Sequence, residues 1–196
     1  MSSAEPAQPH SVCPWWIGYL LASPLRRIFQ RPERILAPYV RQGMTVLEPG
    51  PGMGFFTLEL ARLVGETGRV VAVDIQPRML EALRRRAAKA GVGGRIDARL
   101  SAAESLNIAD LAGKVDFTLA FAVVHEMPGV AAFFRDVARA TRPGGRVLFA
   151  EPGGHVNERQ FASEVQAAGD AGFSTVETPS LPRSRTVVLE LQHSQL

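Results

Sequence analysis

The chain alternates short apolar runs with longer segments in which apolar residues recur at helical spacing. The short runs predict buried strands and the longer segments predict helices. Successive parallel strands need helix-length connections, so this alternation predicts an α/β domain with helices on both faces of a mostly parallel sheet. The expected strands are 44–48, 69–74, 96–100 (nearer the sheet edge), 115–122 and 146–151, and the expected helices are 55–64, 77–90, 130–140 and 158–171.

The end of the chain departs from this alternation. Residues 173–178 and 186–191 are both strand-like, and the link between them is too short for a crossover helix. These two strands should therefore be antiparallel. Together with the five earlier strands they predict a doubly wound, Rossmann-like sheet of seven strands with an antiparallel C-terminal strand. A turn is expected at Pro143-Gly144-Gly145, before the fifth strand.

The length of 196 residues fits a single domain, which we expect to span residues 41–196. Residues 1–40 are interpreted as a tail followed by a lid or cover. Within them, Pro32-Glu33-Arg34 resembles the first turn of a short helix. The aromatic segment 15–21 could wall an apolar pocket, touch a membrane surface, or simply pack on the core.

Charge and cysteine content exclude several classes of protein. The net charge of +3 is spread along the chain, so the clusters Arg26-Arg27 and Arg84–Arg86 are interpreted as solvated helix faces, and no nucleic-acid partner is expected. A single cysteine, Cys13, excludes an intrachain disulfide, and no metal site is expected from the histidine spacing. No apolar stretch is long enough to span a membrane, and the start lacks a signal-peptide pattern, so a cytoplasmic location is expected. The sequence does not indicate an oligomeric state.

The segment Glu48-Pro49-Gly50-Pro51-Gly52-Met53-Gly54 lies between the first expected strand and the first expected helix. Glycine is needed where φ is positive or where a ligand touches the backbone, and the helix start offers free N–H groups. Asp74, twenty residues beyond Gly54, ends the second strand, where a carboxylate can accept ribose hydroxyls. Together these features predict an adenosine-type cofactor.

The glycine spacing separates two kinds of adenosine cofactor. A dinucleotide site is typically G-x-G-x-x-G, whereas this chain has G-x-G-x-G directly preceded by Glu48. An acid at that position suits a cationic amine better than a pyrophosphate. A nicotinamide-dependent oxidoreductase remains an alternative, although the only tyrosines, Tyr19 and Tyr39, precede the sheet.

Four segments carry a family resemblance: VLEPGPGMGFFTLELA, VVAVDIQPRML, VDFTLAFAVVHEMP and RATRPGGRVLFAEP. They resemble successive motifs of the class I S-adenosylmethionine-dependent methyltransferases of the ubiquinone/menaquinone group. The resemblance covers roughly residues 40–192. It implies S-adenosylmethionine as cofactor, S-adenosylhomocysteine as product, and a last strand that runs antiparallel between two parallel ones.

The resemblance also implies which residues bind the cofactor. Gly50 and Gly52 would lie against its methionine portion, Glu48 would orient its amino group, and Asp74 would hold the ribose. The family usually has Asp-Ala after the third strand, where this chain has Ser101-Ala102-Ala103-Glu104, so the acid that receives the adenine amino group is missing. The further implied cofactor contacts are Gly54, Ile75 beside Gln76, the backbone of Ala102 or Ala103, and the backbone of Phe121 and Ala122.

Methyl transfer by direct in-line displacement needs chiefly alignment of nucleophile, methyl carbon and sulfur, and a base only if the acceptor must lose a proton. His125, just beyond the fourth strand, is the candidate base, and Glu126 could orient or charge-pair with it. His125 could instead be structural, and Glu151 and His155 at the same edge could be loop anchors. A chain without room for a substrate domain favours a small-molecule acceptor. A cofactor-binding domain without transferase activity, acting as a partner or regulatory subunit, remains an alternative.

Overall fold

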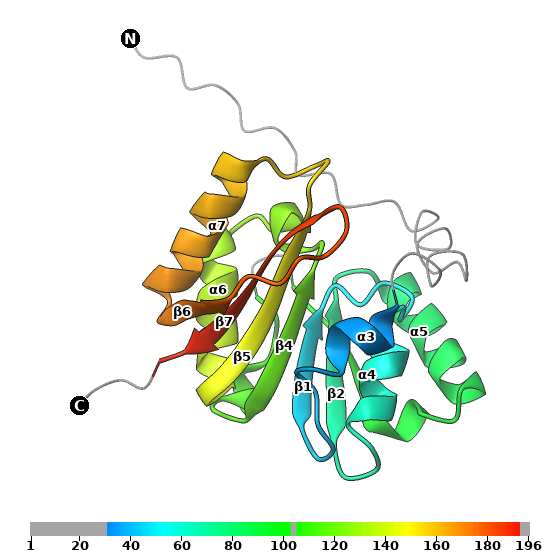
Figure 1. The fold of residues 1–196 in the computed structure, drawn as a ribbon. Helices are drawn as coiled ribbons and strands as arrows, with labels where there is room; N and C mark the ends of the chain where they lie inside the picture. Colours follow the sequence, from blue (N-terminus) through cyan, green and yellow to red (C-terminus); the bar gives the residue numbers. More distant parts are fainter. Residues whose placement is uncertain (1–30, 103–104, 193–196) are drawn as a thin grey trace.

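A computed structural model describes residues 31–102 and 105–192. Its core is one seven-stranded sheet in the order β3-β2-β1-β4-β5-β7-β6 (Figure 1). The strands are β1 Thr45–Pro49, β2 Arg69–Asp74, β3 Ile96–Leu100, β4 Val115–Phe121, β5 Thr141–Pro152, β6 Phe173–Glu177 and β7 Ser184–Leu191. The α-helices are α3 Pro32–Leu36, α4 Thr57–Leu63, α5 Pro77–Lys89, α6 Val130–Ala140 and α7 Glu158–Asp170.

The strand directions confirm the expected fold class. Strands β1 to β5 pair in parallel, whereas β7 is antiparallel to both of its neighbours, β5 and β6. The closing strand therefore lies between two strands that run the other way, as expected. Strand β3 is at the sheet edge, which the sequence also indicated.

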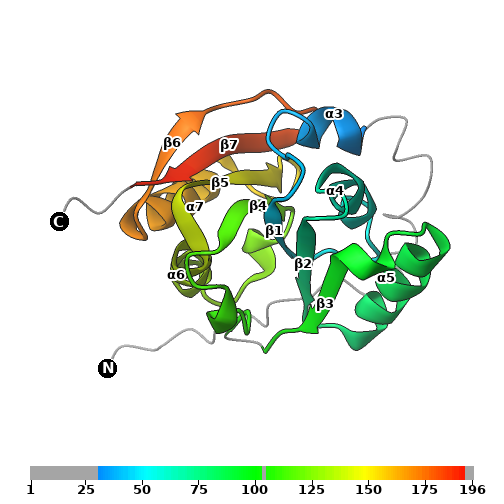
Figure 2. The ribbon, with the colours of Figure 1, turned by 90° about the horizontal axis from the view of Figure 1, so that it is seen from below.

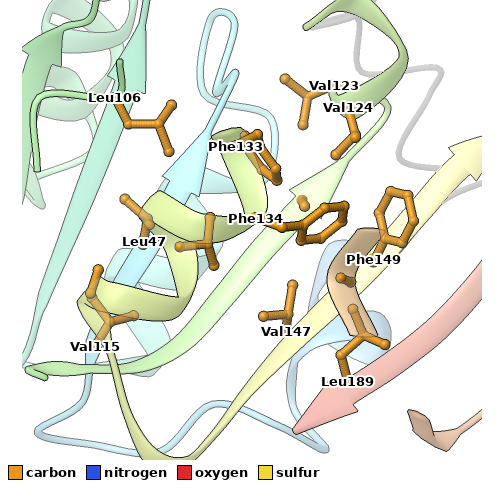
Figure 3. Close-up of a cluster of buried hydrophobic side chains, with 14 of the residues drawn as sticks. Leu47, Leu106, Val115, Val123, Val124, Phe133, Phe134, Val147, Phe149 and Leu189 are labelled. Carbon is orange, nitrogen blue, oxygen red and sulfur yellow. The ribbon is translucent and has the colours of Figure 1, made fainter. Parts of the chain in front are cut away.

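Helices cover both faces of the sheet (Figure 2). Helices α3, α4 and α5 lie on one face, and α6 and α7 lie on the other. Under α6 and α7, Phe134 packs edge-on against Phe133 and Phe149, with ring centroids 5.2 and 5.5 Å apart. Figure 3 shows this cluster reaching Val123 and Val124, which follow β4. The core thus extends to the sheet edge where the strands end.

The start of β5 differs from the sequence prediction. Pro143-Gly144-Gly145 was expected to be a turn before a strand at residues 146–151, but β5 begins at Thr141. Val115 pairs with Thr141 and Phe117 then pairs with Arg146, so residues 142–145 form an irregularity within the strand. The local preference for a turn survives as a positive φ of 71° at Gly144. Pairing with β4 decided the strand boundary, and sequence propensity did not.

Residues before the sheet are part of the core where the structure describes them. Helix α3 begins with Pro32 at its first turn, as expected, and Leu36 and Val40 are buried. Tyr39 stacks on Phe117, with ring centroids 5.9 Å apart. The aromatic segment 15–21 and the tail lie outside the described residues, so the lid and the division at residue 40 stay predictions. No helix among residues 31–102 and 105–192 is long and apolar enough to cross a membrane.

Two arginines of the 84–86 cluster have structural partners. Arg84 donates to the Ala98 carbonyl of edge strand β3 at 2.6 Å, and Arg86 donates to the Met53 carbonyl in the glycine-rich turn. A charged side chain bonded to an edge strand discourages pairing with another chain. Arg84 and Arg86 therefore bond to backbone carbonyls, whereas the sequence indicated a helix face exposed to solvent.

Candidate active site

The predicted site residues come from the carboxyl ends of neighbouring strands. β1 ends at Pro49, β2 at Asp74, β4 at Phe121 and β5 at Pro152. β1 lies between β2 and β4, where the strand order reverses direction. In open α/β sheets, ligands bind outside the carboxyl ends at such a switch point.

The glycine turn after β1 contains three glycines with positive φ: 66° at Gly50, 53° at Gly52 and 84° at Gly54. A Cβ atom on Gly50 would lie 2.5 Å from Val123 Cγ2, and one on Gly54 would collide with Leu83. A Cβ atom on Gly52 would have no neighbour within 4 Å. Packing against Val123 and Leu83 thus explains why glycine is needed at positions 50 and 54. Gly52, by contrast, presents open backbone that a ligand can approach.

The turn is held rigidly on its helical side. Met53 is buried against Met79 and Ala82 of α5, and its carbonyl accepts the hydrogen bond from Arg86. The Gly54 amide donates to the Pro51 carbonyl at 2.9 Å. The open backbone at Gly52 is therefore pre-organised by its neighbours.

Glu48 is a carboxylate buried at the base of this turn, with 3% of its surface exposed. Its Oε2 atom has no hydrogen-bond partner within the described chain. Burial raises the pKa of Glu48 to about 8, the nearby Thr57 hydroxyl opposes that change, and the charge of Asp74 adds to it. Leaving a buried acceptor unpaired costs on the order of 1–3 kcal/mol. A cationic amine would satisfy it, so the residue fits the amino group of S-adenosylmethionine.

Asp74 ends β2 close to the turn. Its Oδ1 accepts the Gln76 amide at 2.9 Å. Burial raises the pKa of Asp74 to about 6, hydrogen bonds from the amides of Gln76, Gly52 and Ile75 oppose that change, and the charge of Glu126 adds to it. Asp74 is thus connected both to the glycine turn and to the loop that follows β4.

Apolar side chains are exposed beside Asp74. Ile75 is 42% exposed, and Leu100, which pairs with Asp74 across the sheet, is 53% exposed. Large exposed apolar residues at the ends of adjacent strands are compatible with the expected adenosine contact at Ile75. The Ala102 amide donates to the Ser105 carbonyl at 3.0 Å and is therefore engaged within its own loop. Ala103 and Glu104 lie outside the described residues.

The end of β4 contains a strained residue. Ala122 has a φ of 56°, and its amide donates to the Ala150 carbonyl of β5 at 2.7 Å. Side chains other than glycine rarely adopt this conformation, and it concentrates at functional sites. The preceding Phe121 packs its ring against Phe56, with centroids 4.7 Å apart. The strained bend leads directly into the short 3-10 helix Val124–Glu126, which contains His125.

His125 is paired with a buried carboxylate that the sequence did not assign to it. Its Nδ1 lies 2.5 Å from Glu151 Oε2, whereas its Nε2 lies 3.9 Å from Glu126 Oε1. The hydrogen bond to Glu151 raises the pKa of His125, burial opposes this, and the charges of Glu151, Glu126 and Glu164 add to it. The orienting role expected for Glu126 is therefore better matched by Glu151, at the end of the adjacent strand.

Glu151 also anchors the loop. Its Oε1 accepts the Val124 amide at 2.8 Å and the His125 amide at 3.2 Å. The ring of His155 lies edge-on to that of His125, with centroids 6.3 Å apart. Among residues 31–102 and 105–192, no three or more His, Cys, Asp or Glu side chains are placed to hold a metal ion, and the absence of a metal stays a prediction.

A family model described as "Methyltransferase domain" matches residues 41–183. The chain belongs to this methyltransferase family. It is 36% identical over 143 residues to the ubiquinone biosynthesis O-methyltransferase of Methylocella silvestris, which covers 72% of this chain and 53% of that protein. It is 37% identical over 112 residues to a ubiquinone/menaquinone biosynthesis C-methyltransferase of Klebsiella pneumoniae, covering 57% of this chain and 44% of that protein.

The fold is also similar to that of solved methyltransferases. A SAM-dependent methyltransferase from Aquifex aeolicus superposes with a TM-score of 0.80 at 22% identity, covering 91% of this chain and 98% of that one. Family and fold confirm the methyltransferase resemblance stated from the motifs. The chain spans about half the length of the two curated relatives named above.

Proposed function

We propose that this chain transfers a methyl group from S-adenosylmethionine to a small-molecule acceptor by direct in-line displacement. The observation that carries this proposal is the buried, unpartnered oxygen of Glu48 beneath a glycine turn whose Gly52 backbone is open. A buried acceptor beside accessible backbone supports binding of an amino-acid tail. Asp74, near the same turn, supports binding of a ribose.

The binding assignments follow from this arrangement. Glu48 would hold the α-amino group, and the open backbone at Gly52 would lie against the methionine portion. Asp74 would accept the ribose hydroxyls, and Ile75 would border the adenosine. The strained bend at Phe121 and Ala122 would supply backbone contacts to the amine.

S-adenosylmethionine supplies an electrophilic methyl group on a sulfonium, so the protein has chiefly to align and shield the reacting atoms. The paired His125 lies beyond the carboxyl end of β4 and is proposed as the base for an acceptor that must lose a proton. Glu126, 3.9 Å from its Nε2, adds negative charge that favours the imidazolium formed by that transfer.

The acceptor is inferred to be a small organic molecule. The names of the two curated relatives, both from quinone biosynthesis, support this class. Structural partners for Arg84 and Arg86 support the expectation that this cluster does not bind nucleic acid. A cytoplasmic location and the absence of peripheral membrane contact stay predictions.

Calorimetry tests the cofactor assignment directly. S-adenosylmethionine and S-adenosylhomocysteine should bind the full chain, and NAD should not. Mass spectrometry of a panel of small hydroxyl, amine and thiol acceptors then tests transfer. Absence of binding by either sulfur compound would refute the proposal, and binding without transfer to any acceptor would favour a cofactor-binding subunit.

A further inference from the structure

Two buried carboxyl groups lie near His125 and raise its pKa. Glu151 of β5 is fully buried, and Glu164 of α7 is 4% exposed. Glu164 Oε1 accepts a hydrogen bond from Gln160, and its Oε2 has no partner within the described chain. Burial raises the pKa of Glu164, and the charge of Glu151 adds to this effect. His125, the proposed base, therefore lies near two buried acid groups whose presence methyl transfer alone does not explain.

Glu151 is placed to control both the position and the protonation of His125. The amides of Val124 and His125 donate to its Oε1, and its Oε2 lies 2.5 Å from the ring Nδ1 of His125. An ionised carboxylate can only accept hydrogen bonds, so this contact requires the proton on Nδ1. In neutral imidazole the other nitrogen, Nε2, then carries the lone pair.

We propose that Glu151 is a positioning residue: it fixes the loop Val124–Glu126 and the Nδ1–H tautomer of His125, so that Nε2 takes a proton from a hydroxyl acceptor. This proposal rests on the methyltransferase function proposed above and names its substrate class. Family membership does not decide this point, because the two named relatives methylate oxygen in one case and carbon in the other, according to their names.

The proton balance of the step is complete without another reactant. The acceptor oxygen forms the new O–C bond with a lone pair, and its proton passes to Nε2. The C–S bond of the methyl donor breaks, and its electron pair stays on sulfur. The resulting imidazolium is paired with Glu151, with further negative charge from Glu126 and Glu164 nearby, and it returns the proton to water. The ring of His155 lies edge-on to the imidazole of His125.

Nitrogen-15 NMR of the full chain tests the tautomer directly. The chain has four histidines, so His125 can be assigned by comparison with the H125Q and H155Q variants. Above its pKa, His125 of the unmodified chain should carry its proton on Nδ1. A proton on Nε2 would overturn the proposal. The tautomer is read in the unmodified chain, and the two variants serve only to assign its signals.

The Glu151→Gln substitution is the sharpest variant because it keeps the shape but adds a donor. Its amide NH₂ can donate to Nδ1, which should move the ring proton to Nε2 and lower the pKa of His125 by roughly one unit or more. Glu164→Gln is the matched control, since it removes a neighbouring carboxyl that does not contact the ring. It should leave the proton on Nδ1 and lower the pKa by less. Equal effects of the two substitutions would contradict the positioning role.

Activity separates this proposal from the one on which it rests. With phenol and thiol panels, Glu151→Gln should lower kcat for phenols at least tenfold and leave S-adenosylhomocysteine affinity within twofold, as expected for lost general-base catalysis. If the unmodified chain methylates thiols but no phenol, the proposal of a hydroxyl acceptor is wrong. No turnover by the unmodified chain would refute the proposed function, while the NMR result would still decide the role of Glu151.

Discussion

Two buried carboxylates at the same edge of the sheet differ in how the chain satisfies them. Glu151 at the end of β5 accepts hydrogen bonds from two backbone amides and contacts the ring Nδ1 of His125. Glu48 in β1 has an oxygen with no partner within the described residues. The contrast separates a carboxylate that organises the protein from one that is suited to a ligand. On this contrast we propose that the ends of β4 and β5 position the base, and that β1 and β2 bind the cofactor together with the bend at Phe121 and Ala122.

Replacing Glu48 with Gln should produce the largest effect and stabilise the ligand-free chain. Its folded pKa is raised, so between about pH 4.5 and 8 the folded state holds a proton that the unfolded state has released, and stability falls as pH rises. At pH 9 the variant should be more stable by roughly 5 kcal/mol, because the pKa rises from 4.5 to about 8 on folding and each pKa unit corresponds to about 1.4 kcal/mol.

Urea unfolding between pH 7 and 9 measures this difference. This range starts above the pKa of about 6 for Asp74. Titration of His125 changes the unfolding free energy of the unmodified chain and of the Glu48→Gln variant alike. The difference should grow with pH, and S-adenosylmethionine affinity of the variant should fall. A pH-independent difference would mean that Glu48 is already ionised in the folded chain.

Replacing Glu151 with Ala should have the opposite sign. It removes the acceptor for two buried amides and for the His125 ring, so we expect a loss of about 2–3 kcal/mol in unfolding free energy. Equilibrium unfolding by circular dichroism checks this loss. Stability unchanged within about 0.5 kcal/mol would show that water replaces the carboxylate and would remove the contrast with Glu48.

Gly50 and Gly52 of the glycine turn can be compared with each other within the proposed cofactor site. Both Gly50→Ala and Gly52→Ala incur backbone strain of roughly 1 kcal/mol, but only Gly50 also requires Val123 to move. Gly50→Ala should therefore cost about 2 kcal/mol or more in stability. Gly52→Ala should cost about 1 kcal/mol while weakening S-adenosylmethionine binding, because its methyl group enters the open side of the turn. Thermal melting and calorimetry on both variants separate the two effects, and equal binding by Gly52→Ala would contradict the assigned ligand contact.

Asp74→Ala should have the smallest effect on cofactor affinity. It should also reduce stability, because the amides of Gln76, Gly52 and Ile75 lose their acceptor. Loss of charge-assisted hydrogen bonds to the ribose should weaken S-adenosylmethionine binding by about 1 kcal/mol or more. Asp74→Asn serves as the control because it preserves the side-chain volume and an acceptor for the Gln76 amide. Calorimetry on the folded variants gives the result, and unchanged affinity would remove Asp74 from the cofactor site.

Within the described residues, the sequence by itself determined the seven strands, the five α-helices, the antiparallel closing strand and the glycine turn. These depend on apolar periodicity and on residues within one loop, so they can be recognised locally. Strand β2 and helix α6, for example, have the bounds that periodicity indicated.

Only the tertiary structure decided the partners of the buried charges. His125 and Glu151 are 26 residues apart and meet because β4 and β5 are adjacent parallel strands that end at the same edge. The start of β5 at Thr141 and the positive φ of Ala122 likewise depend on pairing between these strands. Sequence patterns report which face of an element is apolar, but which polar groups lie opposite one another depends on the packing of distant segments.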